Sequence, residues 1–441
     1  MTEHLVQQVP NLTTALYGPL QALEQHFLDN QIKIECWLRE QLRLTPPPFY
    51  ASVDLRNAGF KLAPVDTNLF PAGFNNLNPD FLPLCVQAVQ TTLEDYYPGT
   101  SRILLIPESH TRNLFYFENV AVLQEILSKA GFEVRIGSLL DEFKKTQTIA
   151  LPSGRKVVLE PLVRHHDQIG VAGFSPDCVL LNNDLSGGIP EILQEIQQPI
   201  LPPLTLGWST RRKSTHFQHY ADVTQTFAQY LQIDPWVITP LFRKCNAVDF
   251  LAREGETCLI EQVDALFQQI RAKYAEYNIS QPPFVAIKAE AGTYGMAVMM
   301  VRSADDIKHL NHKQRTNMAK TKNGQPVTQV IIQEGVYTFE TWGNDQAVAE
   351  PVAYMIGRHV VGGFYRVHTK RGIDENLNSP GMHFEPLAFA SACNCPHVNR
   401  IASEQANRFY AYGVIARLAL IAAARELAQQ TVMVNYPQEI L

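Results

Sequence analysis

The chain has 441 residues, 46% of them hydrophobic and 18% charged, with a formal net charge of −6. This composition is typical of a globular protein of two or three domains, and the lack of a long basic segment argues against a nucleic-acid partner. The seven cysteines lack zinc-ligand spacing, which favours reduced thiols, and Cys85, Cys178 and Cys258 sit in apolar stretches where we expect them to pack. No secretion signal precedes the first predicted helix, so we expect a cytoplasmic protein.

The most apolar stretch, residues 413–428, is interrupted by Arg417 and Arg425. Its uncharged run falls far short of the ~20 residues that a membrane span needs. We therefore expect a buried helix here and no membrane contact.

Residues 1–49 are predicted to form a helical N-terminal segment, because polar and apolar positions mix at helical spacing until the prolines at 46–48 end it. Residues 50–80 are rich in Asn, Pro and Gly and are predicted to form a long irregular loop. Long loops of this kind are usually functional or disordered, and the aromatic residues of this one favour order.

An open α/β sheet is predicted for the following region. Apolar strands are expected at 102–106 and 132–137, with a helix at 117–129 between them and further strands near 157 and 178. The polar residues after the first and last of these strands lie where such a sheet binds ligands. A helix is expected at 213–231.

The second half of the chain has a different pattern. A helix is predicted at 256–277, followed by closely spaced apolar strands and a terminal helix at about 402–429. Hairpin-linked strands flanked by helices indicate an α+β domain, not a second doubly wound sheet.

The strongest local signal is FVAIKAEAGTYGMAVMMV at 284–301, in which an apolar strand carries Lys288 and a short glycine-containing loop leads to a returning strand. Glycine lets backbone N–H groups approach phosphate oxygens, and the lysine adds a positive charge to the same place. An ordinary hairpin with a solvated lysine is the alternative. The P-loop pattern G-x-x-x-x-G-K-[ST] is absent.

Two later segments extend this pattern. VIIQEGV at 330–336 is an apolar strand, and the strands over 350–368 are joined by a turn and lead to Arg366. In this order the three segments resemble an ATP-grasp domain. In such a domain the end of the strand that corresponds to 330–336 binds adenine and ribose, and the arginine stabilises the transferred phosphoryl group. A guanidinium suits that task because its planar fork matches phosphate oxygens. A buried strand and a surface ion pair are the alternative interpretations.

The strings DLRNAGFKLAPVDTNLFPAGFNNL, IKAEAGTYGMAV and RVHTKRGIDENLNSPGMHFEP resemble the proteobacterial-type glutamate–cysteine ligase family, and the similarity runs over most of the chain. The resemblance implies an ATP- and Mg²⁺-dependent ligase. Its reaction would join L-glutamate to L-cysteine through γ-glutamyl phosphate, giving γ-glutamylcysteine, ADP and phosphate, the first step of glutathione biosynthesis.

The resemblance also implies a domain order. The helical segment 1–49 would precede an α/β substrate domain over 50–240, of the kind that comes before an ATP-grasp domain. Residues 241–441 would then form the ATP-grasp-like nucleotide-binding domain with its C-terminal helix. The oligomeric state is left open, a homo-oligomer included.

Site residues follow from the same resemblance, with Lys288 and Arg366 as the catalytic pair. The residues expected to bind ATP are Lys288, Gly292, Thr293, Tyr294, Gly295, Gln333, Glu334 and Gly335. The residues expected to bind the amino-acid substrates are Arg56, Asn57, Asp66, Asn68, Asn75, Asn76, Arg112 and Asn113. The expected Mg²⁺ ligands are Glu350, Asn376 and Asn378, although the strand-borne Glu-x-Asn pair of many ATP-grasp enzymes is missing. Turn formation and structural ion pairs are the alternative roles.

Two other functions fit the same motifs. One is a different ATP-grasp ligase, such as a glutathione synthetase or an amino-acid ligase. The other is a nucleotide-binding protein without catalytic activity.

Overall fold

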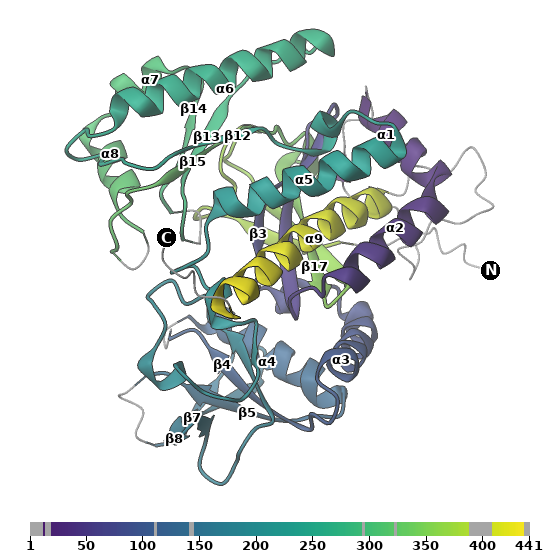
Figure 1. Cartoon of the computed structure of the whole chain (residues 1–441), viewed down its shortest axis with the longest axis vertical. Helices are drawn as coiled ribbons and strands as arrows, with labels where there is room; N and C mark the ends of the chain where they lie inside the picture. The colour runs from purple at the N-terminus through teal and green to yellow at the C-terminus, as the bar shows by residue number, and fades with distance from the viewer. Residues whose placement is uncertain are drawn as a thin grey trace.

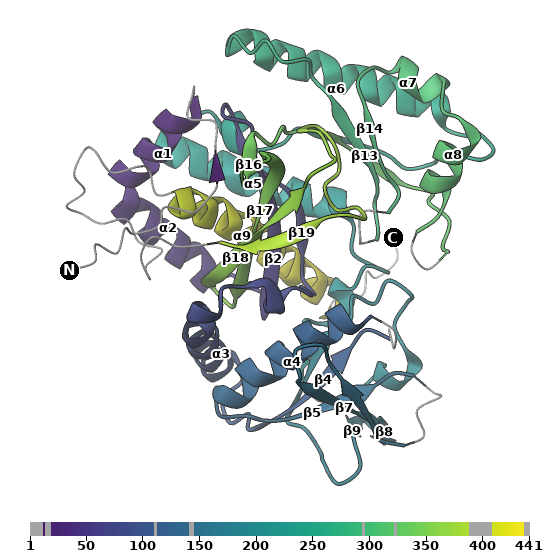
Figure 2. The ribbon, with the colours of Figure 1, turned by 180° about the vertical axis from the view of Figure 1, so that it is seen from behind.

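The computed structural model describes residues 12–13, 19–109, 113–140, 145–292, 296–321, 324–387 and 408–435. Three sheets with their helices follow one another along the long axis of the molecule (Figure 1). A mixed parallel sheet lies at one end, an antiparallel sheet at the other, and a larger antiparallel sheet between them (Figure 2). None of the described helices is long and apolar enough to cross a membrane.

The central sheet is antiparallel throughout and combines strands from both ends of the sequence. Its strands are β1 (Leu12–Thr13), β2 (Tyr50–Asn57), β3 (Leu62–Asn68), β16 (Glu340–Trp342), β17 (Ala347–Ile356), β18 (His359–His368) and β19 (His383–Pro386). The helices that accompany it are α1 (Pro19–Asp29), α2 (Gln31–Leu44), α5 (Lys213–Leu231) and α9 (Arg408–Asn435). α9 lies across β2 and β3, and the other three helices pack around it (Figure 1).

The sheet at the lower end confirms the predicted open α/β sheet. Its strands, in spatial order, are β11 (Ile200–Leu201), β10 (Cys178–Asn182), β4 (Arg102–Pro107), β5 (Glu133–Ser138), β7 (Lys156–Pro161) and β6 (Gln147–Ala150). All pairs are parallel except that of the edge strand β6. Its other elements are α3 (Leu82–Tyr96), α4 (Leu114–Lys129) and a small hairpin of β8 (Val163–His165) and β9 (Gln168–Gly170).

The sheet at the upper end confirms the predicted α+β pattern, because all of its strands are antiparallel. In spatial order they are β12 (Phe242–Cys245), β15 (Val330–Glu334), β13 (Val285–Ala289) and β14 (Val298–Val301). The helices beside it are α6 (Glu256–Glu276), α7 (Asp305–Lys308) and α8 (His312–Ala319). Short 3-10 turns elsewhere are Phe74–Asn76, Pro79–Phe81, Glu191–Leu193, Leu204–Leu206 and Pro235–Ile238.

The prediction of an irregular loop over residues 50–80 was wrong for residues 50–68, whereas residues 69–80 contain no strand and only short 3-10 turns. Residues 50–68 form the β2–β3 hairpin, and β2 pairs with β17, far along the chain. Proline in this stretch does not prevent a strand, because Pro64 lies in β3, which pairs with β2 alone and is an edge strand. Antiparallel pairing across nearly 300 residues could not be seen in the local composition.

The predicted boundaries at residues 50 and 241 do not coincide with the sheets. The β2–β3 hairpin belongs to the central sheet with β17 and β18, and α2 packs on α9. The described helices of residues 1–49, α1 and α2, therefore pack on the C-terminal helix α9. Hydrophobic burial joins segments by their apolar faces, whatever their distance in sequence.

A buried ion pair holds α9 to the segment before α5. The Arg211 guanidinium donates to both carboxylate oxygens of Glu426, at 2.9 and 3.1 Å, and to the backbone oxygen of Thr67. Nδ1 of His216 contacts the same carboxylate. Burial acts to raise the pKa of Glu426, but the charge of Arg211 and the contact with His216 outweigh it and hold that pKa at about 2.

We expect Glu426→Gln to lower the free energy of unfolding by about 3–5 kcal/mol, because it leaves the Arg211 charge buried without a counter-charge. Chemical denaturation followed by circular dichroism measures the change. The matched control is Glu256→Gln, which removes one partner of the surface pair with Arg253 and should have little effect. Equal destabilisation by the two substitutions would contradict a special role for the buried pair.

Candidate active site

A cavity of about 1030 Å³ is lined by residues of all three sheets and their loops. β2, β3, β17 and β18 contribute one wall, β13, β14 and β15 a second, and the loops after β4 and β10 a third. Lys288 and Arg366 both line it, although they belong to different sheets. The segments that the sequence analysis singled out are therefore brought to one place.

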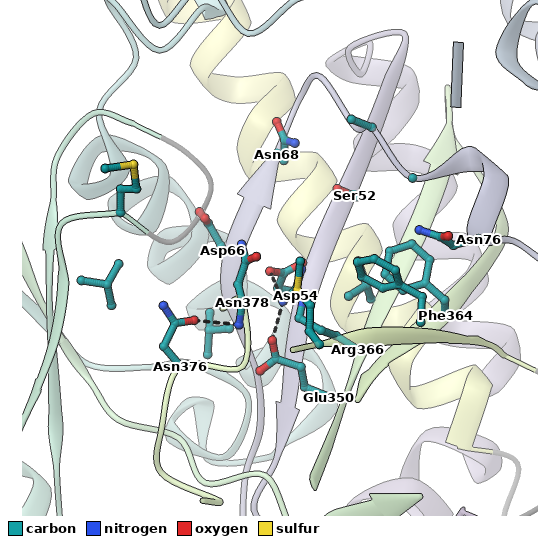
Figure 3. Close-up of a pocket in the computed structure, with 18 of the residues that line it drawn as sticks. Ser52, Asp54, Asp66, Asn68, Asn76, Glu350, Phe364, Arg366, Asn376 and Asn378 are labelled. Atoms are coloured by element: carbon teal, nitrogen blue, oxygen red, sulfur yellow. Dashed lines mark hydrogen bonds and ion pairs between the residues drawn. The ribbon is translucent and has the colours of Figure 1, made fainter. Parts of the chain in front are cut away.

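Four charged side chains form the centre of the first wall. Nη1 of Arg366 donates to Oδ2 of Asp54 at 2.9 Å and also contacts Glu350. Nε of Arg56 donates to the other oxygen of Glu350, at 2.9 Å. The Glu350 carboxylate is thus held between two guanidinium groups, as Figure 3 shows for Arg366.

Strand pairing explains why these groups meet. Glu350 and Arg366 are direct partners in the β17–β18 ladder, and β2 lies on the other side of β17. Alternate residues of a strand share a face, so Ser52, Asp54 and Arg56 can line the cavity together. The alternation of these polar residues with Val53 and Leu55 is the signal that would have identified Ser52 and Asp54, which sequence reasoning missed.

The two acids of this wall differ in their pKa values. Burial would raise the pKa of Glu350, but its two arginine partners lower it below the usual value. Burial raises the pKa of Asp54, and the nearby carboxylates of Glu350 and Asp66 raise it further, against the opposing effect of Arg366. Negative charge is therefore crowded at Asp54.

Asp66, on β3, lies opposite Asp54 in the β2–β3 ladder and pairs with a lysine that sequence reasoning missed. Nζ of Lys213 donates to both Asp66 oxygens, at 2.9 and 3.0 Å, and lies 4.1 Å from the centre of the Trp208 ring. Burial acts to raise the pKa of Asp66, but Lys213 and Lys288 hold it at about 2. Lys213 belongs to a short basic run, and nothing in that run distinguishes it as a cavity residue.

Lys288 lies on the second wall, in β13 next to β15. Its ammonium group donates to the backbone oxygen of Val65 and to Oε1 of Gln333, both at 2.7 Å. Burial, aided by the positive charges of Lys213 and Arg56, lowers the pKa of Lys288 to about 8. At neutral pH Lys288 therefore loses its proton more readily than an exposed lysine does.

Two buried donors at the cavity have no hydrogen-bond partner among the described residues. They are Nε of Arg366 and Nε2 of Gln333, and both side chains line the cavity. Buried polar groups in native proteins are almost always paired. Oxygen atoms of a bound anion or nucleotide would satisfy them.

The strand end at 333–335 lines the cavity, and the carboxylate of its acid is held by three other groups. Glu334 accepts from Nζ of Lys61 at 2.6 Å, from the backbone N–H of Leu241 at 2.9 Å and from Nε1 of Trp236 at 3.2 Å. Its carboxylate is almost fully buried, so the expected contact of this side chain with a ribose finds no support. At Gly335 a Cβ atom would clash with the Phe284 ring, at 2.3 Å.

Most of the other predicted residues also lie at the cavity. Those that line it are Gly292, Arg56, Asp66, Asn68, Asn75, Asn76, Asn113, Asn376 and Asn378. Four lie outside the described residues: Arg112, Thr293, Tyr294 and Gly295. Asn57 does not line the cavity. Its side chain is fully buried, donates to Glu340 and accepts from the backbone N–H of Gly59, so the structure gives no support to a substrate contact of this residue.

The third wall lies at the carboxyl ends of β4 and β10, as the sequence predicted for an open α/β sheet. Glu108 and Asp184 line the cavity there, and Oε1 of Glu108 accepts from the backbone N–H of Asp184 at 2.9 Å. Asn113 caps α4, accepting from the backbone N–H of Tyr116. Asn182 is instead buried, and its amide group donates to Pro71 and Tyr50.

The described residues contain no group of three or more His, Cys, Asp or Glu side chains arranged to hold a metal ion. Asp54, Asp66 and Glu350 do line the same cavity, together with Asn376 and Asn378 (Figure 3). Carboxylate and amide oxygens are the donors that Mg²⁺ prefers, so the chemistry of this set fits that ion.

Comparisons with known proteins identify the family. The family described as glutamate-cysteine ligase (GshA) matches residues 24–427. A crystal structure from Methylobacillus flagellatus KT, called "Putative gamma-glutamylcysteine synthetase", is 56% identical and has a TM-score of 0.88, covering 96% of this chain and 100% of that one. No curated protein matched.

Two more distant structures also match. One is D-alanyl-alanine synthetase A from Vibrio cholerae, 12% identical, with a TM-score of 0.35 over 72% of this chain and 81% of that one. The other is a glutathione synthetase-like effector from Globodera pallida, 11% identical, with a TM-score of 0.35 over 78% and 77%. Scores this low carry no argument. The family match and the Methylobacillus structure suffice, and the chain belongs to the glutamate–cysteine ligase family.

Proposed function

We propose that this cavity uses ATP to join the side-chain carboxylate of L-glutamate to the amine of L-cysteine, giving γ-glutamylcysteine, the first product of glutathione biosynthesis, with ADP and phosphate. The observation that carries the proposal is that Lys288 and Arg366 line one cavity, together with the carboxylates of Asp54, Asp66 and Glu350. Family membership supports the reaction itself. A cavity of about 1030 Å³ offers room for a nucleotide beside an amino acid.

The chemistry requires an activated carboxylate, because an amine cannot displace oxide from a carboxylate. Transfer of the γ-phosphoryl group of ATP to the glutamate side chain gives γ-glutamyl phosphate, and the cysteine amine then attacks its carbonyl carbon with loss of phosphate. The protein's tasks are to position the reactants and to stabilise charge. Arg366 suits the second task because its Nε is a buried donor without a partner among the described residues.

The nucleotide is proposed to lie against the wall that β13 and β15 form. Lys288 and the glycine loop with Gly292 would contact the phosphates, together with Thr293, Tyr294 and Gly295. The backbone of residues 333–335 and the side-chain amide of Gln333 would bind the adenine base. The Glu334 side chain has no part in this arrangement, because it already pairs with Lys61.

Mg²⁺ is proposed to bind near Glu350, with Asp54, Asn376 and Asn378 as further oxygen donors. Bound there, the ion would neutralise negative charge on the phosphates of ATP. Arg56 is then a positioning residue, because its three donor groups reach Glu350 and the backbone oxygens of Val336 and Glu375. This role replaces the direct contact with glutamate that the sequence suggested.

The amino-acid substrates are proposed to bind at the side of the cavity lined by Asn68, Asn75, Asn76 and Asn113. Side-chain amides both donate and accept hydrogen bonds, as recognition of an α-carboxylate and an ammonium group requires. We place the enzyme in the cytoplasm. Of the other functions considered, a different ligase is disfavoured by the family match, and a non-catalytic role by the presence of both Lys288 and Arg366 at one cavity.

The first test concerns the acceptor. With ATP and L-glutamate, we expect L-cysteine and L-2-aminobutyrate to raise ADP formation well above the rate without an acceptor, because both present an α-amine on a side chain of similar size. Replacing L-glutamate by L-aspartate is the control, since it shortens the donor by one methylene. If neither acceptor released more phosphate than water does, the substrate assignment would fail.

The second test concerns Lys288. We expect Lys288→Met to reduce turnover by about a hundredfold to a thousandfold, because the substitution keeps the length of the side chain and removes the charge beside the phosphates. ADP release at saturating substrate is the measurement, and a thermal melt verifies folding. Lys244→Met, on β12 of the same sheet but outside the cavity lining, is the matched control. Turnover like that of the unmodified enzyme would exclude Lys288 from the mechanism.

The third test uses pH. Lys288 is protonated below about pH 8 and loses its charge above it, so affinity for a non-hydrolysable ATP analogue should fall by about tenfold per pH unit above 8. Calorimetric titration with Mg²⁺ between pH 7 and 9.5 measures this. Lys288→Arg keeps its charge throughout and should flatten the profile. Identical profiles for the two proteins would show that another group controls binding.

A further inference from the structure

Two cysteines outside the cavity lining lie in contact with each other. Sγ of Cys245, the last residue of β12, is 3.2 Å from Sγ of Cys258, in the first turn of α6. Cys245 is buried and Cys258 is exposed, contrary to the sequence-based expectation that Cys258 packs in the core. The pair therefore combines an accessible thiol with a protected one.

The segment that joins the two cysteines is compact. Asp249 and Glu254 exchange backbone hydrogen bonds of 3.0 and 3.1 Å, and Oδ1 of Asp249 also accepts from the backbone N–H groups of Leu251 and Ala252. Gly255 has φ of 72°, and a Cβ atom there would lie 1.8 Å from the backbone oxygen of Ala247. These contacts hold the end of β12 and the start of α6 in fixed positions.

We propose that Cys245 and Cys258 form a reversible disulfide, a modification site at which a low-molecular-weight disulfide oxidises the protein. A disulfide bond is about 2.0 Å long, so the two sulfur atoms must approach by about 1.2 Å. The fixed segment between them keeps the thiols together, and proximity of this kind favours reaction strongly.

The reaction balances as two thiol–disulfide exchanges. The Cys258 thiolate attacks one sulfur of the small disulfide, forming a mixed disulfide and releasing one small thiolate, which takes up the proton that Cys258 lost. Cys245 then gives up its proton and attacks Sγ of Cys258, releasing the second small thiol. Burial raises the pKa of Cys245 to about 11, so Cys258 is the thiol that reacts first.

The new bond would link α6 to the sheet that carries Lys288. Cys245 pairs with Val330 on β15, and Val330 pairs with Ala289, the neighbour of Lys288 on β13. The bridged cysteines are only 13 positions apart, so the bond closes a short loop and restricts the unfolded chain. Oxidation should therefore stabilise this part of the protein against unfolding.

The experiment incubates the intact protein with bis(2-hydroxyethyl) disulfide and 2-mercaptoethanol in varied ratio, then blocks free thiols and digests with trypsin. Cleavage after Lys244, Arg253 and Arg271 places the two cysteines on separate peptides, 245–253 and 254–271. We expect these peptides to become linked, with loss of two hydrogen atoms, and to separate on reduction. We also expect oxidation to raise the melting temperature by several degrees.

Two variants make the result decisive. Cys258→Ser should show neither the linked peptides nor the rise in melting temperature. Cys36→Ser, which removes an exposed cysteine on α2, should show both. The proposal fails if the wild-type protein carries only a mixed disulfide at Cys258. It fails equally if oxidation changes the melting temperature of Cys258→Ser as much as that of the wild type.

Discussion

The carboxylate of Glu350, held between Arg56 and Arg366, is the interaction on which the geometry of the cavity depends. A buried carboxylate or guanidinium is strongly destabilising unless a partner of opposite charge lies beside it. With Asp54 the group contains two positive and two negative side chains, so its formal charges cancel. Because its members come from β2, β17 and β18, the requirement for pairing fixes these three strands to one another in register. The polar wall is therefore preorganised by the same contacts that hold the sheet together.

A second buried pair links the central sheet to the sheet that carries Lys288. Lys61, in the turn before β3, donates to Glu334 at 2.6 Å and lies 4.0 Å from the centre of the Trp236 ring. This joins the central hairpin to the end of β15, whose backbone faces the cavity. Nζ of Lys288 adds a further connection through the backbone oxygen of Val65 on β3. The two antiparallel sheets are thus linked by charged groups whose removal would alter the cavity and the packing together.

Strands and site residues could be predicted from the sequence where the pattern that defines them is local. The strands around Lys288, Gln333 and Arg366 were predicted because apolar runs and turns define them without reference to the rest of the chain. The β2–β3 hairpin was missed because its Asn, Pro and Gly content resembles a loop, and its pairing partner lies far along the chain. The sequence could not distinguish Asn57 from Asn76 either, because asparagine favours turns at both positions. Only the tertiary structure places Asn57 in the core and Asn76 at the cavity.

The pKa of Lys288 is lowered and the pKa of Asp54 is raised, and burial is the main cause of both shifts. Burial and neighbouring positive charges lower the pKa of Lys288, whereas burial and neighbouring carboxylates raise the pKa of Asp54. Each charged form is disfavoured chiefly because burial removes its hydration, and neighbouring groups of the same sign add to this effect. An anion beside Lys288 and a cation beside Asp54 would relieve both effects at once. The triphosphate and the magnesium ion of the proposed function would supply charges of these two signs.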